Sequence, residues 1–469
     1  MTLIRSLLIA ASAATLAACA VGPKYHAPAE PPVALTATHP NVVAGAAEAD
    51  WWKAFGDPEL DSLIARALAA NLDVRVAVDR VREARALFQD TELDQFPRVT
   101  TAADYTRSKA QQPGVTTDKV SLKQADVGFD AAWEIDLFGR VRHGVEAARA
   151  DAEAAQADLR DVQVTVAAEV ARNYLELRGA QARRAVAEEN ANTQKDTLRL
   201  TNVRFEIGSG DPVDVESARA RLNATEAAIP TLRTAEAQAG HRLAVLVGVR
   251  PGALDAELAA ASATATAAPT AIPIGDASNF LRRRPDVQAA ERQLAAETAR
   301  TGVATADLFP RLSVTGFVGF LSGDVSGLFK SGSQAWSVSP TLTWPGLDMG
   351  GARARLRAQQ ARGDASLALY DQAVLRAVED LQNALVAYRE RQGQVVSLSQ
   401  QVAASRRAAE LAHIRYKEGR IDFLRVLDAE RTRLEAEDSL AAAQTAANVD
   451  VVTIYKALGG AGAAPAAAD

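Results

Sequence analysis

Residues 335–344 read AWSVSPTLTW and residues 124–133 read QADVGFDAAW. In the first segment Trp336, Val338 and Trp344 share one face, and serines and threonines occupy the other. An alternation about ten residues long with aromatic ends is typical of strands that cross a membrane. A soluble hairpin pair packed on a helix would show the same alternation, so this pattern alone leaves both possibilities open.

Each segment has a strand-like partner before it in the chain. These partners are residues 97–106 and 310–320, of which the second alternates poorly. The connections, residues 108–122 and 321–334, are rich in Gly, Ser and Lys and suit loops at the cell surface. Four strands cannot close a barrel in lipid, because known membrane barrels begin at about eight strands. If the strands span a membrane, two or three copies of the chain must share one barrel.

Long proline-free stretches accompany the strands. Residues 139–208 contain no proline, so a helix of about 65 residues and about 100 Å is possible. Residues 354–416 are similar, with apolar residues at the spacing of a coiled-coil seam. Returning helices are expected over residues 213–247 and 423–458, and Pro230 should kink or split the first of them.

The same plan occurs twice along the chain, which indicates a tandem repeat. Residues 96–98, FPR, return as residues 309–311, and residues 204–208, RFEIG, return as RYKEG at 415–419. The two members of each matched pair are separated by nearly the same number of residues.

The N-terminus has the features of a secretion and lipidation signal. Arg5 precedes a short apolar run that ends in Leu16-Ala17-Ala18-Cys19. Cys19 is the only cysteine of the chain, and the pattern resembles a bacterial lipobox, whose cysteine receives lipid after cleavage. The residue after Cys19 is Ala20 and not an aspartate, so the resemblance to a lipobox implies sorting to the outer membrane. The alternative is an ordinary cleaved signal with a chance cysteine. The proline-rich stretch that follows should be extended.

Composition and motifs argue against several functions. The formal net charge is -6, so nucleic acid is not an expected partner. Phosphate-binding and dinucleotide-binding motifs are missing, the five histidines lack metal-ligand spacing, and no catalytic grouping can be formed. We therefore expect no enzyme, no metal and no cofactor apart from lipid on Cys19. The arginines at 282–284 are most simply a solvated helix end.

These features predict a signal peptide over residues 1–18 and a lipidated extended segment over 19–50. A first repeat over 51–247 should hold strands near 97–106 and 124–133 and long helices near 140–205 and 213–247. An inter-repeat linker over 248–279 should lead to a second repeat over 280–458, with strands near 310–320 and 335–344 and long helices near 354–416 and 423–458, and then to a tail over 459–469.

Several short motifs occur in a fixed order along nearly the whole chain. They are Cys19 with GPKY at 22–25, WW at 51–52 with FGDP at 55–58, NLD at 71–73, DLFGR at 136–140, RYKEG at 415–419 and VLDA at 426–429. This ordered set resembles the TolC-like outer-membrane factor family, in its OprM-type (NodT) efflux lipoprotein branch.

The resemblance implies a mixed α/β membrane protein. In it, a homotrimer completes a twelve-stranded transmembrane β-barrel and a long α-helical barrel that crosses the periplasm of a Gram-negative bacterium. It implies a passive outer-membrane duct for small toxic compounds, partnered by a periplasmic adaptor and an inner-membrane RND-type pump. A duct for type I protein secretion is the first alternative. A lipid-anchored periplasmic coiled-coil scaffold without a pore is the second.

The resemblance also implies a periplasmic gate at the two helix–turn–helix ends, near Gly208 and Gly419. By motif position, Asp214 and Tyr416 correspond to one contact pair of this gate, and Asp428 to a carboxylate that lines the constriction.

Two departures and one alternative qualify this gate. One branch of the family can carry an acidic residue where this chain has Arg425 and a basic residue where it has Ile421. A salt link from Arg425 to Asp214 or Asp428 is therefore a conjecture. For Asp211 and Asp422, helix capping is the favoured interpretation.

Overall fold

The structure is a computed structural model that describes residues 20–29, 40–43, 45, 49–111, 118–260, 269, 271–274 and 280–460. The expected signal peptide, the lipid attachment at Cys19 and the tail beyond residue 460 lie outside these residues. The chain forms two compact units. Unit 1 contains Met1–Ala29, Asp79–Gln156 and Ala289–Gln372, and unit 2 contains Glu30–Val78, Ala157–Gln288 and Ala373–Asp469.

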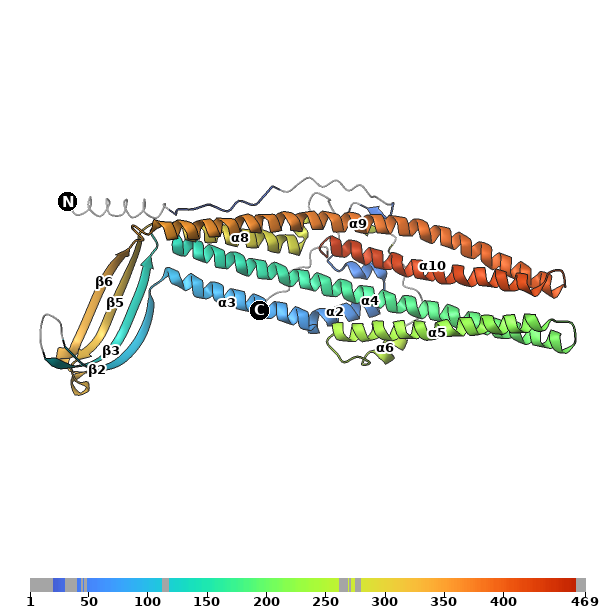
Figure 1. The fold of residues 1–469 in the computed structure, drawn as a ribbon, viewed down its shortest axis with the longest axis horizontal. Coiled ribbons are helices and arrows are strands. Elements are labelled where there is room, and N and C mark those ends of the chain that lie inside the picture. The colour runs from blue at the N-terminus through green and yellow to red at the C-terminus, as the bar shows by residue number, and fades with distance from the viewer. Residues whose placement is uncertain are drawn as a thin grey trace. The chain divides into compact units, whose positions relative to one another are not determined.

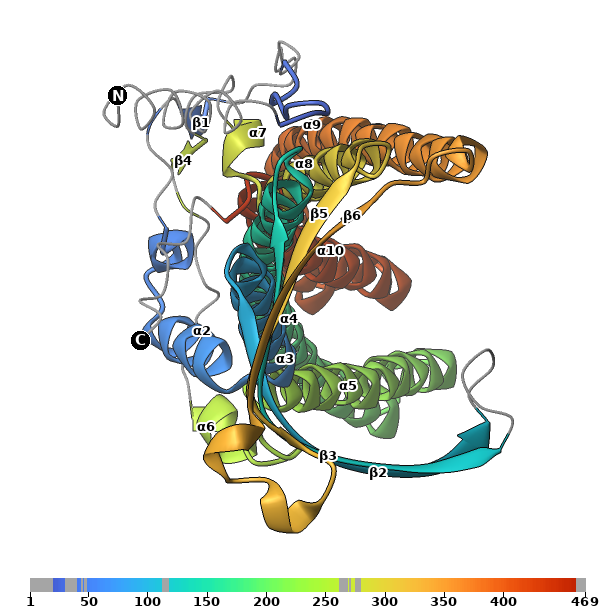
Figure 2. The ribbon, with the colours of Figure 1, turned by 90° about the vertical axis from the view of Figure 1, so that its left-hand side faces the viewer.

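Unit 1 holds a four-stranded antiparallel sheet, which Figure 2 shows to be strongly curved. In pairing order its strands are β2 (Arg98–Gln111), β3 (Lys119–Ile135), β5 (Arg311–Ser322) and β6 (Gln334–Thr343). Two short 3-10 turns, η3 (Val325–Gly327) and η4 (Ser331–Ser333), lie between β5 and β6. The strands β2 and β6 are the two edges of this sheet.

The register gives the sheet one apolar face. Phe129, Val318 and Trp336 are paired neighbours across β3, β5 and β6, and their side chains are 55%, 58% and 78% exposed. The adjacent row carries Asp130, Phe317 and Ser337 on the opposite face. The predicted period-two alternation is therefore present in β3 and β6, and Phe317 interrupts it in β5, the strand whose sequence alternates poorly.

The hairpin of β2 and β3 is longer than the sequence predicted. Pairing continues from Ser108 opposite Leu122 to Gln111 opposite Lys119, within the stretch that we had expected to be a loop. Residues 108–111 are mostly polar, so no apolar face marked them as part of a strand. Antiparallel strands pair through backbone hydrogen bonds, which do not require an apolar face.

Long helices make up most of the remaining chain (Figure 1). The helices α3 (Leu72–Glu92), α4 (Arg140–Glu206), α8 (Pro285–Ala306) and α9 (Met349–Lys417) contribute residues to both units. A 3-10 turn, η2 (Leu93–Gln95), follows α3. No helix in the described part of the chain is long and apolar enough to cross a membrane.

Unit 2 adds shorter elements and two returning helices. Its elements are η1 (Trp51–Phe55), α2 (Pro58–Ala70), α5 (Pro212–Leu246), α6 (Asp255–Ala260), α7 (Phe280–Arg283), α10 (Phe423–Ala457) and a parallel pair of β1 (Val42–Val43) with β4 (Ile272–Pro273). The observed bounds of α4, α5, α9 and α10 lie within five residues of the expected ones.

Pro230 does not split the returning helix, because α5 is continuous from Pro212 to Leu246. Pro230 is exposed, so water can solvate the carbonyl group that loses its hydrogen bond. The expected split is therefore wrong, and the kink stays a prediction.

The segment after the lipobox is extended, as expected, and lies on α4 and α8 in unit 1. The amide of Val21 donates to the Phe138 carbonyl at 3.0 Å, and Nε2 of His143 lies 3.1 Å from the Val21 carbonyl oxygen. Further along, the Tyr25 hydroxyl donates to Glu291 at 2.8 Å, and burial raises the pKa of Tyr25. This segment is thus held at Val21 and at Tyr25.

Candidate functional site

The two long hairpins of unit 2 end in similar turns, which Figure 1 places at the same end of the unit. Gly208 and Gly419 have φ angles of 77° and 70°, a backbone conformation that side chains with Cβ disfavour. Asp211 accepts a hydrogen bond from the amide two residues on at 2.8 Å, and Asp422 from the amide three residues on at 3.1 Å. Both aspartates cap their helices, which confirms that interpretation.

An aromatic cluster joins the two hairpins next to these turns. Tyr416 is 7% exposed and lies in a buried cluster with Ala218, Phe423 and Val426. Its ring lies 5.3 Å from that of Phe423, between ring centres. The guanidinium carbon of Arg204, from α4, lies 4.5 Å from the centre of the Tyr416 ring. A cation over an aromatic face stabilises the contact between α4 and α9.

Arg204 is also the counter-charge for the predicted residue Asp214. Partial burial, followed by the charges of Asp211 and Asp422, raises the pKa of Asp214, while Arg204 lowers it. Burial likewise raises the pKa of Tyr416, again opposed by Arg204. Asp214 and Tyr416 are therefore brought within electrostatic reach of each other, with Arg204 interacting with both.

Asp428 lies further along α10 and is exposed. Its carboxylate pairs with Arg431, one turn on, at 2.9 Å, and its side chain is 66% exposed. The backbone amide of Arg425 donates to Asp422. Within this single chain, the ion pair formed by Asp428 is with Arg431 and not with Arg425.

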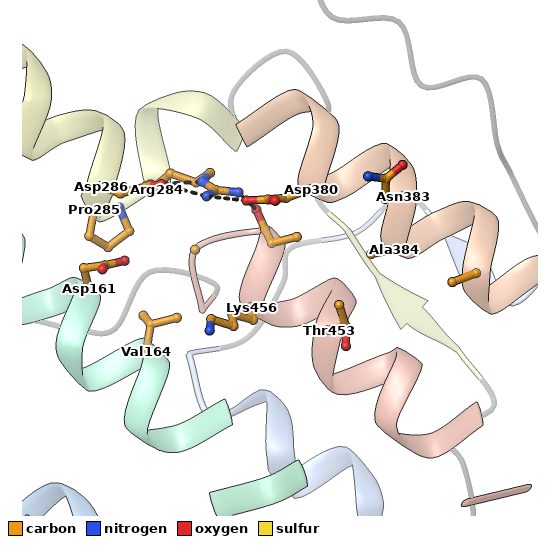
Figure 3. Close-up of a pocket in the computed structure, with 13 residues that line it drawn as sticks. Asp161, Val164, Arg284, Pro285, Asp286, Asp380, Asn383, Ala384, Thr453 and Lys456 are labelled. Atoms are coloured by element: carbon orange, nitrogen blue, oxygen red, sulfur yellow. Dashed lines mark hydrogen bonds and ion pairs between the residues drawn. The ribbon is translucent and has the colours of Figure 1, made fainter. Parts of the chain in front are cut away.

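A second polar site in unit 2 lines a cavity of about 440 Å³ (Figure 3). Arg284 is 8% exposed and pairs with Asp286 at 2.7 Å and Asp380 at 3.0 Å. It also donates to the carbonyl of Ala457 at 3.0 Å, near the end of α10. The expectation that Arg284 is solvated is wrong, because its guanidinium joins α8, α9 and α10.

The described residues contain no group of three or more His, Cys, Asp or Glu side chains that could hold a metal ion. The features that characterise the described chain are a curved sheet with an apolar row on one face, two long helical hairpins, and charged residues near the hairpin turns.

Known proteins share this architecture. A solved structure described as the outer-membrane channel OprN has 46% sequence identity and a TM-score of 0.88, over 94% of this chain and 99% of that chain. The fold is therefore that of the TolC-like outer-membrane channels, mostly helical with some sheet.

Sequence comparison gives the same class of protein. Residues 63–249 and 277–460 match the family described as outer membrane efflux protein. The antibiotic efflux pump outer membrane protein ArpC of Pseudomonas putida is 31% identical over 477 residues, covering 97% of this chain and 96% of ArpC. The cation efflux system protein CusC of Escherichia coli (strain K12) is 28% identical over 452 residues, covering 96% and 97%.

The chain belongs to the outer membrane efflux protein family. It is the outer-membrane channel component of a tripartite efflux system in a Gram-negative bacterium. Its relatives are channel proteins and not enzymes.

Proposed function

We propose that this chain works as a homotrimer in which three four-stranded sheets close one twelve-stranded barrel. The observation that supports this proposal is the open sheet, whose edge strands β2 and β6 each have one side without a neighbouring strand in the described chain. Unpaired backbone groups are costly in lipid, and pairing β6 of one copy with β2 of the next would satisfy them.

The proposed organisation includes two tandem repeats and a lipid on Cys19. The order of strand pair, long helix, turn and returning helix occurs twice among the described elements. The extended segment that begins at Ala20 is held against α4 and α8 near the sheet, which suits a membrane anchor one residue earlier.

We propose a periplasmic adaptor and an RND-type inner-membrane pump as the partners, and small toxic compounds as the substrates. The names of ArpC and CusC associate relatives with antibiotics and with cations. A duct shared by such different substrates would contribute little selectivity of its own, so the pump and adaptor would choose the cargo.

The proposed gate is the periplasmic mouth, defined here as the turns at residues 207–211 and 418–422 with the adjacent helix ends. Arg204, Asp214 and Tyr416 would hold the two hairpins together within one copy. Asp428 would form a ring of carboxylates around the threefold axis, and Arg425 would form a salt link to Asp214 or Asp428. A symmetric ring of carboxylates attracts cations.

The experiment that tests this proposal combines mass and conductance. The purified chain in mild detergent should have about three times the monomer mass of 49.5 kDa. In planar bilayers, Asp428→Ala should raise single-channel conductance and reduce cation preference. Asp79→Ala, which removes the same kind of exposed Asp–Arg pair on α3, should change neither.

A monomeric species would contradict the trimer. Unchanged conductance and cation preference in Asp428→Ala would remove Asp428 from the gate and leave the trimer standing.

A further inference from the structure

A buried carboxylate lies between α9 and α10 close to the proposed mouth. Glu430 on α10 is 1% exposed, and its Oε1 lies 2.6 Å from Nε2 of His413 on α9. The second carboxylate oxygen, Oε2, is buried and has no hydrogen-bond partner. Glu430 lies one turn along α10 from the buried Val426 of the Tyr416 cluster. A buried carboxylate is costly unless it is paired and hydrogen-bonded, so His413 is the contact that makes its burial tolerable.

Opposite Glu430, the helix α4 carries the uncharged polar side chains Asn190 and Gln194. The contacts Arg183–Asp438 and Asn190–Arg433 show that α4 and α10 run in opposite directions. One turn beyond Asn190 toward the mouth is Gln194, and one turn beyond Arg433 toward the mouth is Glu430. The two side chains therefore lie at one level. Gln194 is 3% exposed, and both polar atoms of its amide are without a partner.

Fixed charges lie on the helices around the pair. On α9, Glu410 pairs with Arg407, and Lys417 follows His413 by one turn. On α10, Arg433 donates to Asn190. A guanidinium keeps its charge at any pH that a cell meets, whereas an imidazole changes its charge between about pH 5 and pH 8.

Three more charged groups, on α4 and α5, lie around Glu430 and His413 or nearer the turn. On α4, Lys195 pairs with Glu226 of α5 at 2.9 Å, and Arg204 lies over Tyr416 nearer the turn. Among these groups His413 is the imidazole, and its Nε2 is the contact of the buried Glu430 carboxylate.

We propose that Glu430 and His413 form an ionisable tie between α9 and α10, so that the closure of the mouth depends on pH. This proposal rests on the proposed gate, and it gives Glu430 and His413 a positioning role there. With His413 protonated, the buried carboxylate faces a cation and the hairpin is held together. As pH rises and the imidazole loses its proton, the carboxylate keeps its charge and loses its counter-charge, which weakens the packing of α9 on α10.

The test compares wild type, Glu430→Gln and His413→Gln in planar bilayers at about pH 5.5 and about pH 8, the two sides of an ordinary imidazole titration. The wild-type ratio of open to closed channels should rise about threefold or more between the two pH values, since small differences in interaction shift such ratios strongly. Both variants should lose this dependence.

Arg406→Gln is the matched control. It breaks the Arg406–Glu437 pair, which also joins α9 and α10 at 2.7 Å but contains no imidazole. This variant should keep the wild-type difference between the two pH values. A wild-type channel that does not respond to pH, or an equal response in Glu430→Gln, overturns the tie while leaving the proposed function intact.

Hydrogen exchange provides a readout that does not need conductance. After correction for the intrinsic rate, amides of residues 405–417 and 426–437 should lose protection between about pH 5.5 and about pH 8 in wild type but not in Glu430→Gln. If neither the wild type nor any variant conducts, the proposed function fails. The hydrogen-exchange measurement then decides on the tie by itself. The same change in amide protection with pH in wild type and in Glu430→Gln would refute the tie.

Discussion

At the scale of single residues, the environment of Asp161 shows how a charge inside the helical packing affects stability. Asp161 on α4 lines the cavity of Figure 3, which Asp286 and Asp380 also line. Burial, followed by the charge of Asp286, raises the pKa of Asp161, and Arg284 and Lys456 only partly oppose this shift. The folded protein therefore holds the proton of Asp161 more tightly than the unfolded chain does.

The stability contribution of Asp161 should decrease as pH rises. Because the folded-state pKa lies above the ordinary value, the free energy of unfolding falls as pH rises from about 4 through the raised pKa. Asp161→Asn should stabilise the protein at neutral pH, by an amount on the order of 1 kcal/mol. The measurement is the thermal midpoint in detergent at several pH values. Asp371→Asn, at an exposed position of α9, is the control and should give no gain. A gain that is the same at about pH 4 and at about pH 8 would contradict this origin.

Residue roles that depend on distant partners were the part that sequence could not provide. Arg284 looked like a solvated helix end, yet its guanidinium bonds a carbonyl near the end of α10, 173 positions away. Arg204 belongs to the repeated RFEIG motif, and this recurrence was the only signal that could have singled it out. Its position over Tyr416 depends on two hairpins meeting, which no local pattern encodes.

At the scale of elements, close helix contacts depend on particular small residues. Gly179 on α4 lies against Thr445 on α10, and a Cβ at residue 179 would lie 2.9 Å from the Thr445 Cβ. Gly393 on α9 is also helical, but a Cβ there would meet nothing within 4 Å. A comparison of alanine substitutions at the two positions therefore distinguishes two effects. Gly179 is needed for close packing of α4 on α10, whereas Gly393 only lowers the helix propensity of α9.

Gly179→Ala should destabilise unit 2 by about 1–3 kcal/mol, because overpacking forces the helices apart. Gly393→Ala should be neutral or stabilise by up to about 1 kcal/mol, as expected for an open helical site. Thermal unfolding in detergent measures both. Thr445→Ala should partly rescue Gly179→Ala in a double-mutant cycle. Simple additivity of the two changes would show that the contact is not the cause.

Most elements could be predicted because their signals are local. Alternation identified the strands, and the absence of proline identified α4 and α9. The same local reasoning failed where surroundings decide the outcome. Pro230 lies on an exposed face that tolerates it, and residues 108–111 pair without an apolar face. Local patterns thus gave the identity of elements better than their ends.

At the scale of the whole molecule, the sheet is the part whose stability depends on its surroundings. Its apolar row of Phe129, Val318 and Trp336 is largely exposed in a single chain. Such a surface is unfavourable in water and favourable in lipid. The opposite face carries Asp130 and Ser337 in the neighbouring row, on either side of Phe317, and these polar residues suit a water-filled interior. In the proposed trimer, the sheet would therefore have lipid on one face and water on the other, provided that neighbouring copies close the barrel.

This separation predicts opposite outcomes for two neighbouring substitutions on β6. Val338 is 62% exposed and lies on the apolar face, and Ser339 lies on the other face. Val338→Arg should cost about 2–4 kcal/mol in the membrane, whereas Ser339→Arg should face water and leave assembly nearly unchanged. The fraction of heat-modifiable folded oligomer in outer-membrane extracts measures both. Because both variants add the same charge to the same edge strand, a difference between them can come only from the face. Equal loss in both would mean that β6 does not separate lipid from water, and the closed barrel would then lose its physical basis.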